Sequence, residues 1–387
     1  MHISDTIRHI GVNDYEQDLF EGQYMLEAGM AYNSYVILDE KIAVMDTADA
    51  HVLDQWEKNL LEALDGRKPD YLIVQHLEPD HSAGIEKIAT MFPEMQLVGT
   101  AGTARMLPQF TDSDLSGRFQ TVKEGDEISL GSHTLTFIPA PMVHWPEVMM
   151  TYEKSEKVFF SADGFGKFGT WDADEDWACE ARRYYFGIVG KYGASVQNVL
   201  KKAANLDIAV IAPLHGPVLT ENLGYYIGLY DTWSSYKPET KGVFIACASI
   251  HGNTLAAAEK LAELLREKGE EVVELSDLTR EDMAECVEDA FRHDRMVLMA
   301  SSYDAGVFLP MADFLTHLSA KAFQNRTIAL VQNTSWAPSA INTMKKMLEP
   351  LKDIRLLEPE VTIKTRVRDA DIENLSRLAD ALIEAGR

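Results

Sequence analysis

Cysteine is scarce in this sequence. Its 387 residues include three cysteines, Cys179, Cys247 and Cys286, and no two of them are spaced as CxxC. Neither a disulfide framework nor a zinc or iron–sulfur site built from cysteine is therefore supported. Any metal ion in this protein has to be bound by histidines and carboxylates.

Basic residues and long apolar runs are also few. The sequence has 36 lysines and arginines against 61 aspartates and glutamates, a formal net charge of −25, and such a field repels phosphate backbones, which argues against a nucleic-acid partner. No apolar run approaches the roughly 20 residues that a membrane-spanning helix needs. The N-terminal segment lacks the basic start and apolar core of a signal peptide. These absences predict a soluble, cytoplasmic protein.

The pattern of apolar runs changes once along the chain. A polar segment at 232–241 separates the two patterns, so the sequence predicts one domain at 1–240 and another at 241–387. The first domain contains many short strand-like runs linked by turns and a few helices. In the second, five apolar runs that we expect to form strands, the last of them IRLLEPEVTI, alternate with helical stretches, which is typical of a doubly wound parallel sheet.

Four residues that can bind a metal lie within six positions of the first domain, directly after an apolar run. They are His76, Glu78, Asp80 and His81. An irregular loop at a strand end can turn such side chains toward one point. The mixture of carboxylate and imidazole suits iron or manganese as well as zinc. A single HxE pair is more often a charged, solvated turn, so this run alone leaves both interpretations open.

Three later residues strengthen the metal interpretation. His144, Asp163 and His215 each follow an apolar, strand-like run. A lone histidine at such a position is more often a hydrogen-bonded core or turn residue. Recurrence of ligand-type residues at three strand ends favours one shared metal site instead.

The run HxExDH, followed by these three residues, resembles the metallo-β-lactamase superfamily, whose fold is an αββα sandwich with a dinuclear metal site. Hydrolases of that superfamily usually carry a histidine at the position of Glu78. A carboxylate there resembles the flavodiiron branch, in which it favours iron over zinc. The resemblance implies that one iron is held by His76, Glu78 and His144, that the other is held by Asp80, His81 and His215, and that Asp163 bridges them.

A second motif opens the C-terminal domain. The apolar run GVFIACA is followed by a short polar loop and then by a helical stretch. Small and hydroxyl residues at a helix N-terminus can bind a phosphate through free backbone N–H groups, although an ordinary capped helix start has the same composition. No Walker lysine follows and GxGxxG is absent, so FMN fits better than a nucleoside triphosphate or a dinucleotide. The loop consists of Ser249, Ile250, His251, Gly252, Asn253 and Thr254.

Two later loops are expected beside this motif, because the carboxyl ends of parallel strands meet at one edge of the sheet. Both loops resemble the isoalloxazine-binding loops of flavodoxins, in which an aromatic side chain often stacks on the ring. Tyr303 and Trp336 are the candidates for that role, and an ordinary surface aromatic is the alternative for each. The loops consist of Ser301, Ser302, Tyr303, Asp304, Ala305 and Gly306, and of Asn333, Thr334, Ser335, Trp336 and Ala337.

The whole chain thus resembles a flavodiiron protein of the simplest two-domain class. The resemblance implies an α/β protein with a metallo-β-lactamase-like αββα sandwich and a flavodoxin-like doubly wound parallel sheet. It implies two non-haem irons, FMN, and reduction of O2 to water, of NO to nitrous oxide and water, or of both. It further implies an external electron donor, with rubredoxin the one expected, and a head-to-tail homodimer, with a tetramer left open.

Two other functions remain open from the sequence. One is a zinc hydrolase of the metallo-β-lactamase superfamily fused to a flavodoxin-like domain. The other is an electron carrier whose metal domain serves only for docking. Metal analysis separates the first from a diiron enzyme, and gas consumption separates the second. The ligand residues by themselves do not set the preference between O2 and NO.

Overall fold

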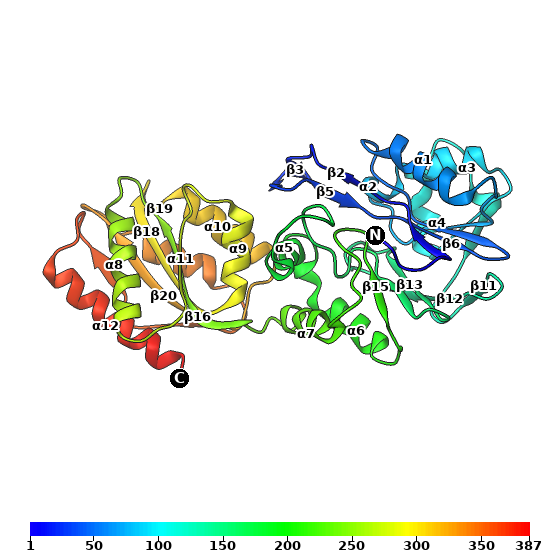
Figure 1. Cartoon of the computed structure of the whole chain (residues 1–387). Helices are drawn as coiled ribbons and strands as arrows, with labels where there is room; N and C mark the ends of the chain where they lie inside the picture. Colours follow the sequence, from blue (N-terminus) through cyan, green and yellow to red (C-terminus); the bar gives the residue numbers. More distant parts are fainter. The chain divides into compact units, whose positions relative to one another are not determined.

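The computed structural model describes all residues from Met1 to Arg387 and divides into two compact units, Met1–Asp231 and Thr232–Arg387 (Figure 1). Each unit has its own sheets and its own buried apolar residues. None of the helices combines the length and the apolar character that crossing a membrane requires.

The N-terminal unit contains two facing sheets. The strand order of the first sheet is β1 (Ile7–His9), β6 (Tyr35–Leu38), β7 (Ile42–Met45), β8 (Tyr71–Ile73), β9 (Gln96–Gly99) and β10 (Phe119–Thr121). The order of the second is β11 (Glu127–Ser129), β12 (Thr134–Pro139), β13 (Met149–Glu153), β14 (Val158–Phe160) and β15 (Val210–Ala212). Two small two-stranded sheets complete this unit: β2 (Val12–Asp14) pairs with β5 (Met30–Tyr32), and β3 (Leu19–Phe20) pairs with β4 (Tyr24–Met25).

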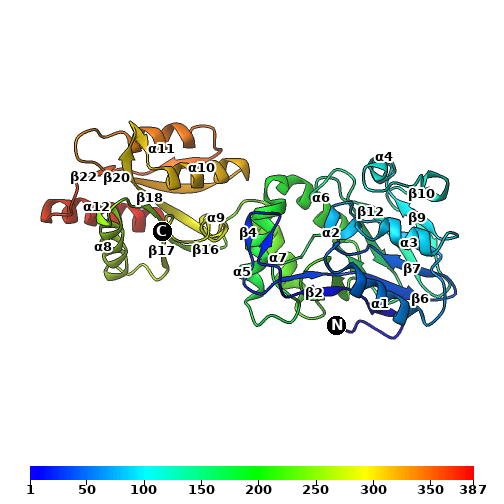
Figure 2. The same ribbon diagram turned by 90° about the horizontal axis from the view of Figure 1, so that it is seen from above.

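Alternation along the strands explains why the two sheets pack together. Successive side chains of a strand point to opposite faces, so every second residue can point into a shared core. Ile37 and Met45 of the first sheet belong to the same buried cluster as Phe137 and Phe160 of the second. Helices α1 (Leu53–Leu64) and α3 (Ile85–Met91) lie beside the first sheet (Figures 1 and 2), and α6 (Gly193–Ala203) lies by the second. The predicted αββα sandwich is confirmed.

The C-terminal unit is built on one parallel sheet. Its strand order is β17 (Val273–Asp277), β16 (Thr240–Ala248), β18 (His293–Tyr303), β20 (Arg326–Asn333) and β21 (Ile354–Leu356), with β22 (Val361–Ile363) also paired to β20. All of these pairings are parallel, and β19 (Gly306–Val307) adds a short antiparallel pair to β18. In chain order the main strands run 2-1-3-4-5, which is the flavodoxin-like order.

Helices cover both faces of this sheet (Figure 1). One face carries α8 (Asn253–Glu267) and α12 (Asp369–Ala385), and the other carries α9 (Met283–Arg292), α10 (Leu309–Ala320) and α11 (Ala340–Leu348). The predicted doubly wound sheet is confirmed. One detail differs: the run IRLLEPEVTI, predicted as a single strand, is split into β21 and β22. Pro359 lies between them and has no N–H with which to continue the ladder.

Candidate functional site

The seven predicted metal ligands come together at one end of the N-terminal unit. His76 and Glu78 follow β8, and the single-turn helix α2 (Pro79–Ser82) carries Asp80 and His81. The other three follow strands of the second sheet: His144 follows β12, Asp163 follows β14 and His215 follows β15. Both sheets therefore contribute to one site, and all seven ligand residues lie in the segments that follow strand ends.

The first cluster contains His76, Glu78, His144 and Asp163, whose ligand atoms all lie within 4.8 Å of one another. Glu78 Oε2 is 2.9 Å from His144 Nε2 and 3.2 Å from His76 Nε2. Asp163 Oδ2 lies 3.2 Å from His144 Nε2 and 3.3 Å from His76 Nε2. Two imidazoles and two carboxylates thus converge on one point.

The second cluster contains Asp80, His81 and His215, again with ligand atoms within 4.8 Å. Asp80 Oδ2 lies 3.2 Å from His81 Nε2 and 3.3 Å from His215 Nε2. The remaining oxygen of Asp163, Oδ1, is 3.3 Å from His81 Nε2. Asp163 therefore lies between the two clusters and presents one oxygen to each.

The unsatisfied polar atoms of this site fit a pair of bound cations. Both carboxylate oxygens of Asp80 and both of Asp163 are buried without a hydrogen-bond partner. His81 Nε2 and His215 Nε2 face each other at 3.1 Å, although a neutral imidazole carries only one N–H. Burying unpaired carboxylates is costly unless a cation compensates their charge. The donor set of imidazole nitrogen and carboxylate oxygen suits iron, manganese or zinc.

The bridging position is occupied by an ionised carboxylate. Burial alone raises the pKa of Asp163, but the surrounding imidazoles of His76, His144 and His81 outweigh burial and lower that pKa well below its usual range. An ionised aspartate offers two anionic oxygens, so it can serve two cations at once.

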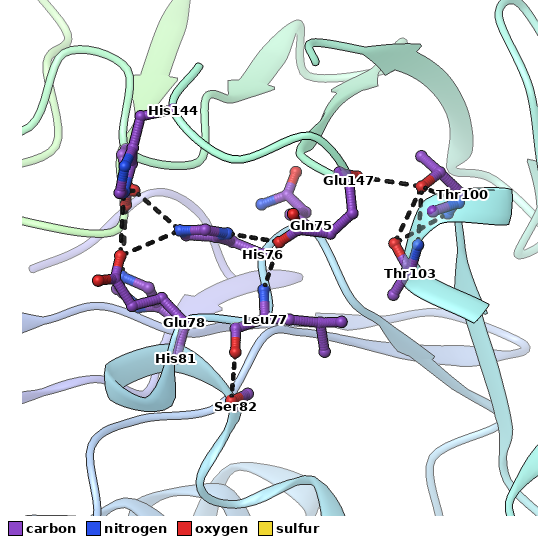
Figure 3. A network of polar contacts seen from close by, with 12 residues as sticks. Gln75, His76, Leu77, Glu78, His81, Ser82, Thr100, Thr103, His144 and Glu147 are labelled. Atoms are coloured by element: carbon purple, nitrogen blue, oxygen red, sulfur yellow. Dashed lines mark hydrogen bonds and ion pairs between the residues drawn. The ribbon is translucent and has the colours of Figure 1, made fainter. Parts of the chain in front are cut away.

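Outer hydrogen bonds orient the imidazoles. His76 Nδ1 donates to Glu147 Oε1 at 2.8 Å (Figure 3), and His215 Nδ1 donates to the carbonyl oxygen of Ala31 at 2.8 Å. Because Nδ1 carries the proton in each ring, Nε2 is left with its lone pair directed into the cluster. Glu147 had no signal in the sequence, since a lone glutamate three residues after His144 looks like any surface charge.

Asn33 holds the loop that carries His215. Its side-chain amide donates to the carbonyl oxygens of Pro213 and Gly216, at 2.9 and 2.8 Å, on either side of the histidine. His9 Nε2 lies 2.9 Å from Asn33 Oδ1 and fixes the orientation of the amide. Sequence reasoning missed Asn33 as well, because its partners lie about 180 residues further along the chain.

The C-terminal unit contains a cavity of about 380 Å³ at the carboxyl ends of β16, β18 and β20. It falls within the size range of small-molecule pockets. Fifteen of the predicted loop residues line it, with the exceptions of Gly252 and Gly306. Gly252 instead precedes α8 with a φ of 83°, a backbone conformation that glycine adopts without strain, and Gly306 pairs with Tyr303. Ser339 and Thr365 also line the cavity and were not predicted.

The polar groups of this cavity fit FMN. Ser249 Oγ is buried without a hydrogen-bond partner, beside the N-terminus of α8, where backbone N–H groups can bind a phosphate. Thr254 Oγ1 contacts Ser301 Oγ at 2.9 Å and joins the first loop to the second. Trp336 and Tyr303, 90% and 43% exposed, lie at the rim, where a flat ring can stack on them.

Known proteins match this chain over both of its units. Residues 30–216 match the family described as ODP family beta lactamase. An uncharacterized protein of Methanocaldococcus jannaschii is 33% identical over 278 residues, which cover 70% of each chain. The anaerobic nitric oxide reductase flavorubredoxin of Vibrio vulnificus is 28% identical, over 95% of this chain and 76% of the relative.

Among solved structures, rubredoxin oxygen:oxidoreductase from Desulfovibrio gigas superposes with a TM-score of 0.91 at 24% identity, covering 100% of this chain and 98% of the other. The fold is therefore shared over both units. Taken with the paired ligand clusters and the flavin-type cavity, these matches show that the chain belongs to the flavodiiron protein family.

Proposed function

We propose that this chain is an oxidoreductase that reduces dioxygen to water, nitric oxide to nitrous oxide, or both, at a non-haem diiron site supplied with electrons by FMN. The observation that carries the proposal is the position of Asp163, with one oxygen toward each of two ligand clusters. Relatives named as a nitric oxide reductase and as an oxygen:oxidoreductase support the reaction class.

The proposed ligands divide evenly. One iron is assigned to His76, Glu78 and His144, the other to Asp80, His81 and His215, and Asp163 is shared. Two irons bound in this way would supply electrons and open coordination positions for a diatomic gas, and FMN would accept electrons from a donor and pass them on singly or in pairs. The protein contributes ligand sets that mix imidazole and carboxylate, which suit iron, and it buries six of the seven ligand residues away from bulk water.

The flavin is assigned to the cavity of the C-terminal unit. The N-terminus of α8 and the hydroxyls of Ser249 and Thr254 would hold the phosphate, and the loops at 301–306 and 333–337 would hold the ring system. This assignment gives the iron chemistry to residues 1–240 and the flavin chemistry to residues 241–387. Support comes from the hydroxyl-rich lining at one end of the cavity and the exposed aromatic side chains at its rim.

The proposal includes an external electron donor, with rubredoxin as the first choice, since relatives carry rubredoxin in their names. It also includes a cytoplasmic location and a head-to-tail homodimer or tetramer in which the flavin of one subunit serves the irons of another. The exposed side chains of Trp336 and Tyr303 beside the flavin cavity support this arrangement, because another molecule can cover them.

The test is a parallel steady-state assay of the purified chain with O2 and with NO under one reductant, reduced rubredoxin. We expect about two irons and one FMN per chain, and consumption of at least one gas. The variant His81→Ala/His215→Ala serves as the control that should lose iron and activity together. Zinc in place of iron, or no consumption of either gas by a chain that holds both cofactors, would overturn the proposal.

A further inference from the structure

The two halves of the proposed metal centre have the same kinds of ligand group but different surroundings. Each half has two imidazoles and one carboxylate of its own, and Asp163 is shared, so the ligands alone would make the halves equal. Behind His76 lies a carboxylate, that of Glu147, and both side chains are fully buried. Behind His215 lies only the neutral carbonyl group of Ala31, and His81 Nδ1 is buried without a partner.

Glu147 is held firmly in place (Figure 3). Its Oε1 accepts from His76 Nδ1 at 2.8 Å and from the backbone N–H of Leu77 at 3.0 Å. Its own carbonyl oxygen accepts from the hydroxyl of Thr100 at 3.1 Å. The first turn of α4 (Ala101–Met106) packs so closely that a Cβ on Gly102 would lie 3.0 Å from Glu147 Cβ. These contacts hold the Glu147 backbone and its carboxylate beside His76.

No side chain other than that of His76 is hydrogen-bonded to this carboxylate. Glu147 Oε2 is buried and has no hydrogen-bond partner. Asp46 is a second buried carboxylate nearby, but it accepts from the backbone N–H groups of Gln75 and His76 and from the Gln75 side chain, and not from an imidazole. Glu147 is thus the one carboxylate that reaches a metal-ligand ring through its second nitrogen.

A carboxylate that accepts the Nδ1 proton makes the opposite nitrogen a stronger donor and places negative charge near the cation. We infer that Glu147 is a positioning residue that makes the half formed by His76, Glu78 and His144 the tighter metal site. Divalent ions then fill this half first and the half formed by Asp80, His81 and His215 second, and iron in the first half is the harder of the two to reduce. This inference rests on the proposed diiron function.

The test is a calorimetric titration of the full chain with Co²⁺, after iron has been removed by a chelator and with FMN retained. The unmodified chain should show two binding steps of different affinity. Glu147→Gln should weaken the tighter step about 10- to 100-fold, the usual cost of losing such an outer partner, and change the weaker step less than about threefold. Reductive titration of the iron-loaded proteins should show a wider range of the mixed-valence state in the unmodified chain than in Glu147→Gln.

Glu153→Gln is the matched control. Glu153 is also fully buried, faces the imidazole of His133 at 3.0 Å, and accepts from the backbone N–H groups of Ser155 and Glu156 at 2.8 and 2.7 Å. It contacts no proposed metal ligand, so both cobalt steps should be unchanged. Equal loss of affinity in the two glutamate variants would overturn the inference.

Two ligand variants assign the steps without altering Glu147, which keeps the test decisive if Glu147→Gln does not fold. His144→Ala should remove the tighter step, and His215→Ala should remove the weaker one. The reverse assignment, or two steps of equal affinity in the unmodified chain, would overturn the inference and leave the proposed function standing. Fewer than two cobalt ions per chain would overturn both.

Discussion

The two sites of this protein are built in different ways. The metal centre is made of buried side chains from loops that lie far apart in the chain, and its imidazoles depend on partners such as Glu147 and Ala31. The flavin cavity is made mainly of the loops at the carboxyl ends of three neighbouring strands of one sheet, and it opens to an exposed rim. Substitutions in the metal centre should therefore lower cofactor binding and activity far more than substitutions at the flavin rim.

The largest effect is expected from removing a ligand. Glu78→Ala should lower iron content and reduce gas consumption by more than about 100-fold, because losing a ligand costs at least as much as losing its outer partner. FMN content should be unchanged, since the flavin residues lie in the other unit. Iron analysis, flavin absorbance and gas consumption provide the measurement. Full activity in an iron-poor variant would end the diiron assignment.

The second-largest effect is expected when the metal site and the flavin site are disabled on different chains. This experiment tests whether electrons pass between the two sites of one chain or across subunits. His81→Ala/His215→Ala and a flavin-site variant, Ser249→Asp/Thr254→Asp, whose carboxylates repel the phosphate of FMN, should each be almost inactive alone. After joint dissociation and reassembly, random pairing should restore about a quarter of normal activity, because half of the dimers are mixed and each has one intact pair of sites. Mixed dimers that retain both cofactors and still fail to consume gas would exclude electron transfer across the interface.

A smaller effect is expected from His9, which supports the loop of His215 through Asn33. The flavin cavity has no corresponding residue. Burial lowers the pKa of His9 to about 4, and the hydrogen bond with Asn33 offsets only part of that effect. The unfolded chain therefore binds more protons than the folded chain between about pH 6.5 and 4, so stability falls as the pH falls through this window.

Between pH 7 and 5, His9 should remove about 2 kcal/mol from the free energy of unfolding of the N-terminal unit. His9→Gln, which cannot take up a proton, should lose less stability over the same interval. Urea unfolding at the two pH values measures the difference, with His51→Gln at an exposed position as the control. An identical pH dependence in His9→Gln and the unmodified chain would contradict the prediction.

The smallest effect is expected at the flavin rim. Trp336→Ala should raise the dissociation constant of FMN about 2- to 10-fold, since an aromatic stacking contact contributes about 0.5–1.5 kcal/mol. Trp336→Phe should keep most of the affinity, and the iron content of both variants should equal that of the unmodified chain. Fluorescence titration of the flavin-depleted protein measures the constant. If Glu78→Ala lost more FMN than iron, the expectation that substitutions act mainly on the site they belong to would be wrong.

Sequence periodicity predicted a strand-rich N-terminal unit and the doubly wound sheet of the C-terminal unit, whereas the αββα sandwich followed from the family resemblance. Apolar residues that alternate or recur at helical spacing are a local property, so strands and helices can be recognised without knowing what packs against them. The ligand-type residues were found for a related reason, because each directly follows an apolar run. The run around Pro359 was the exception, since the paired ladder, and not the apolar character, decides where a strand ends.

Tertiary structure decided which residues support the site. Asn33 binds carbonyl groups about 180 residues away, and Glu147 reaches His76 across 71 residues. Ser339 and Thr365 join the flavin cavity from segments outside the three predicted loops. No spacing rule connects such partners, because a polar side chain looks the same in the sequence whether it meets water or a buried imidazole. Only the folded arrangement of both sheets brings these groups within hydrogen-bond distance.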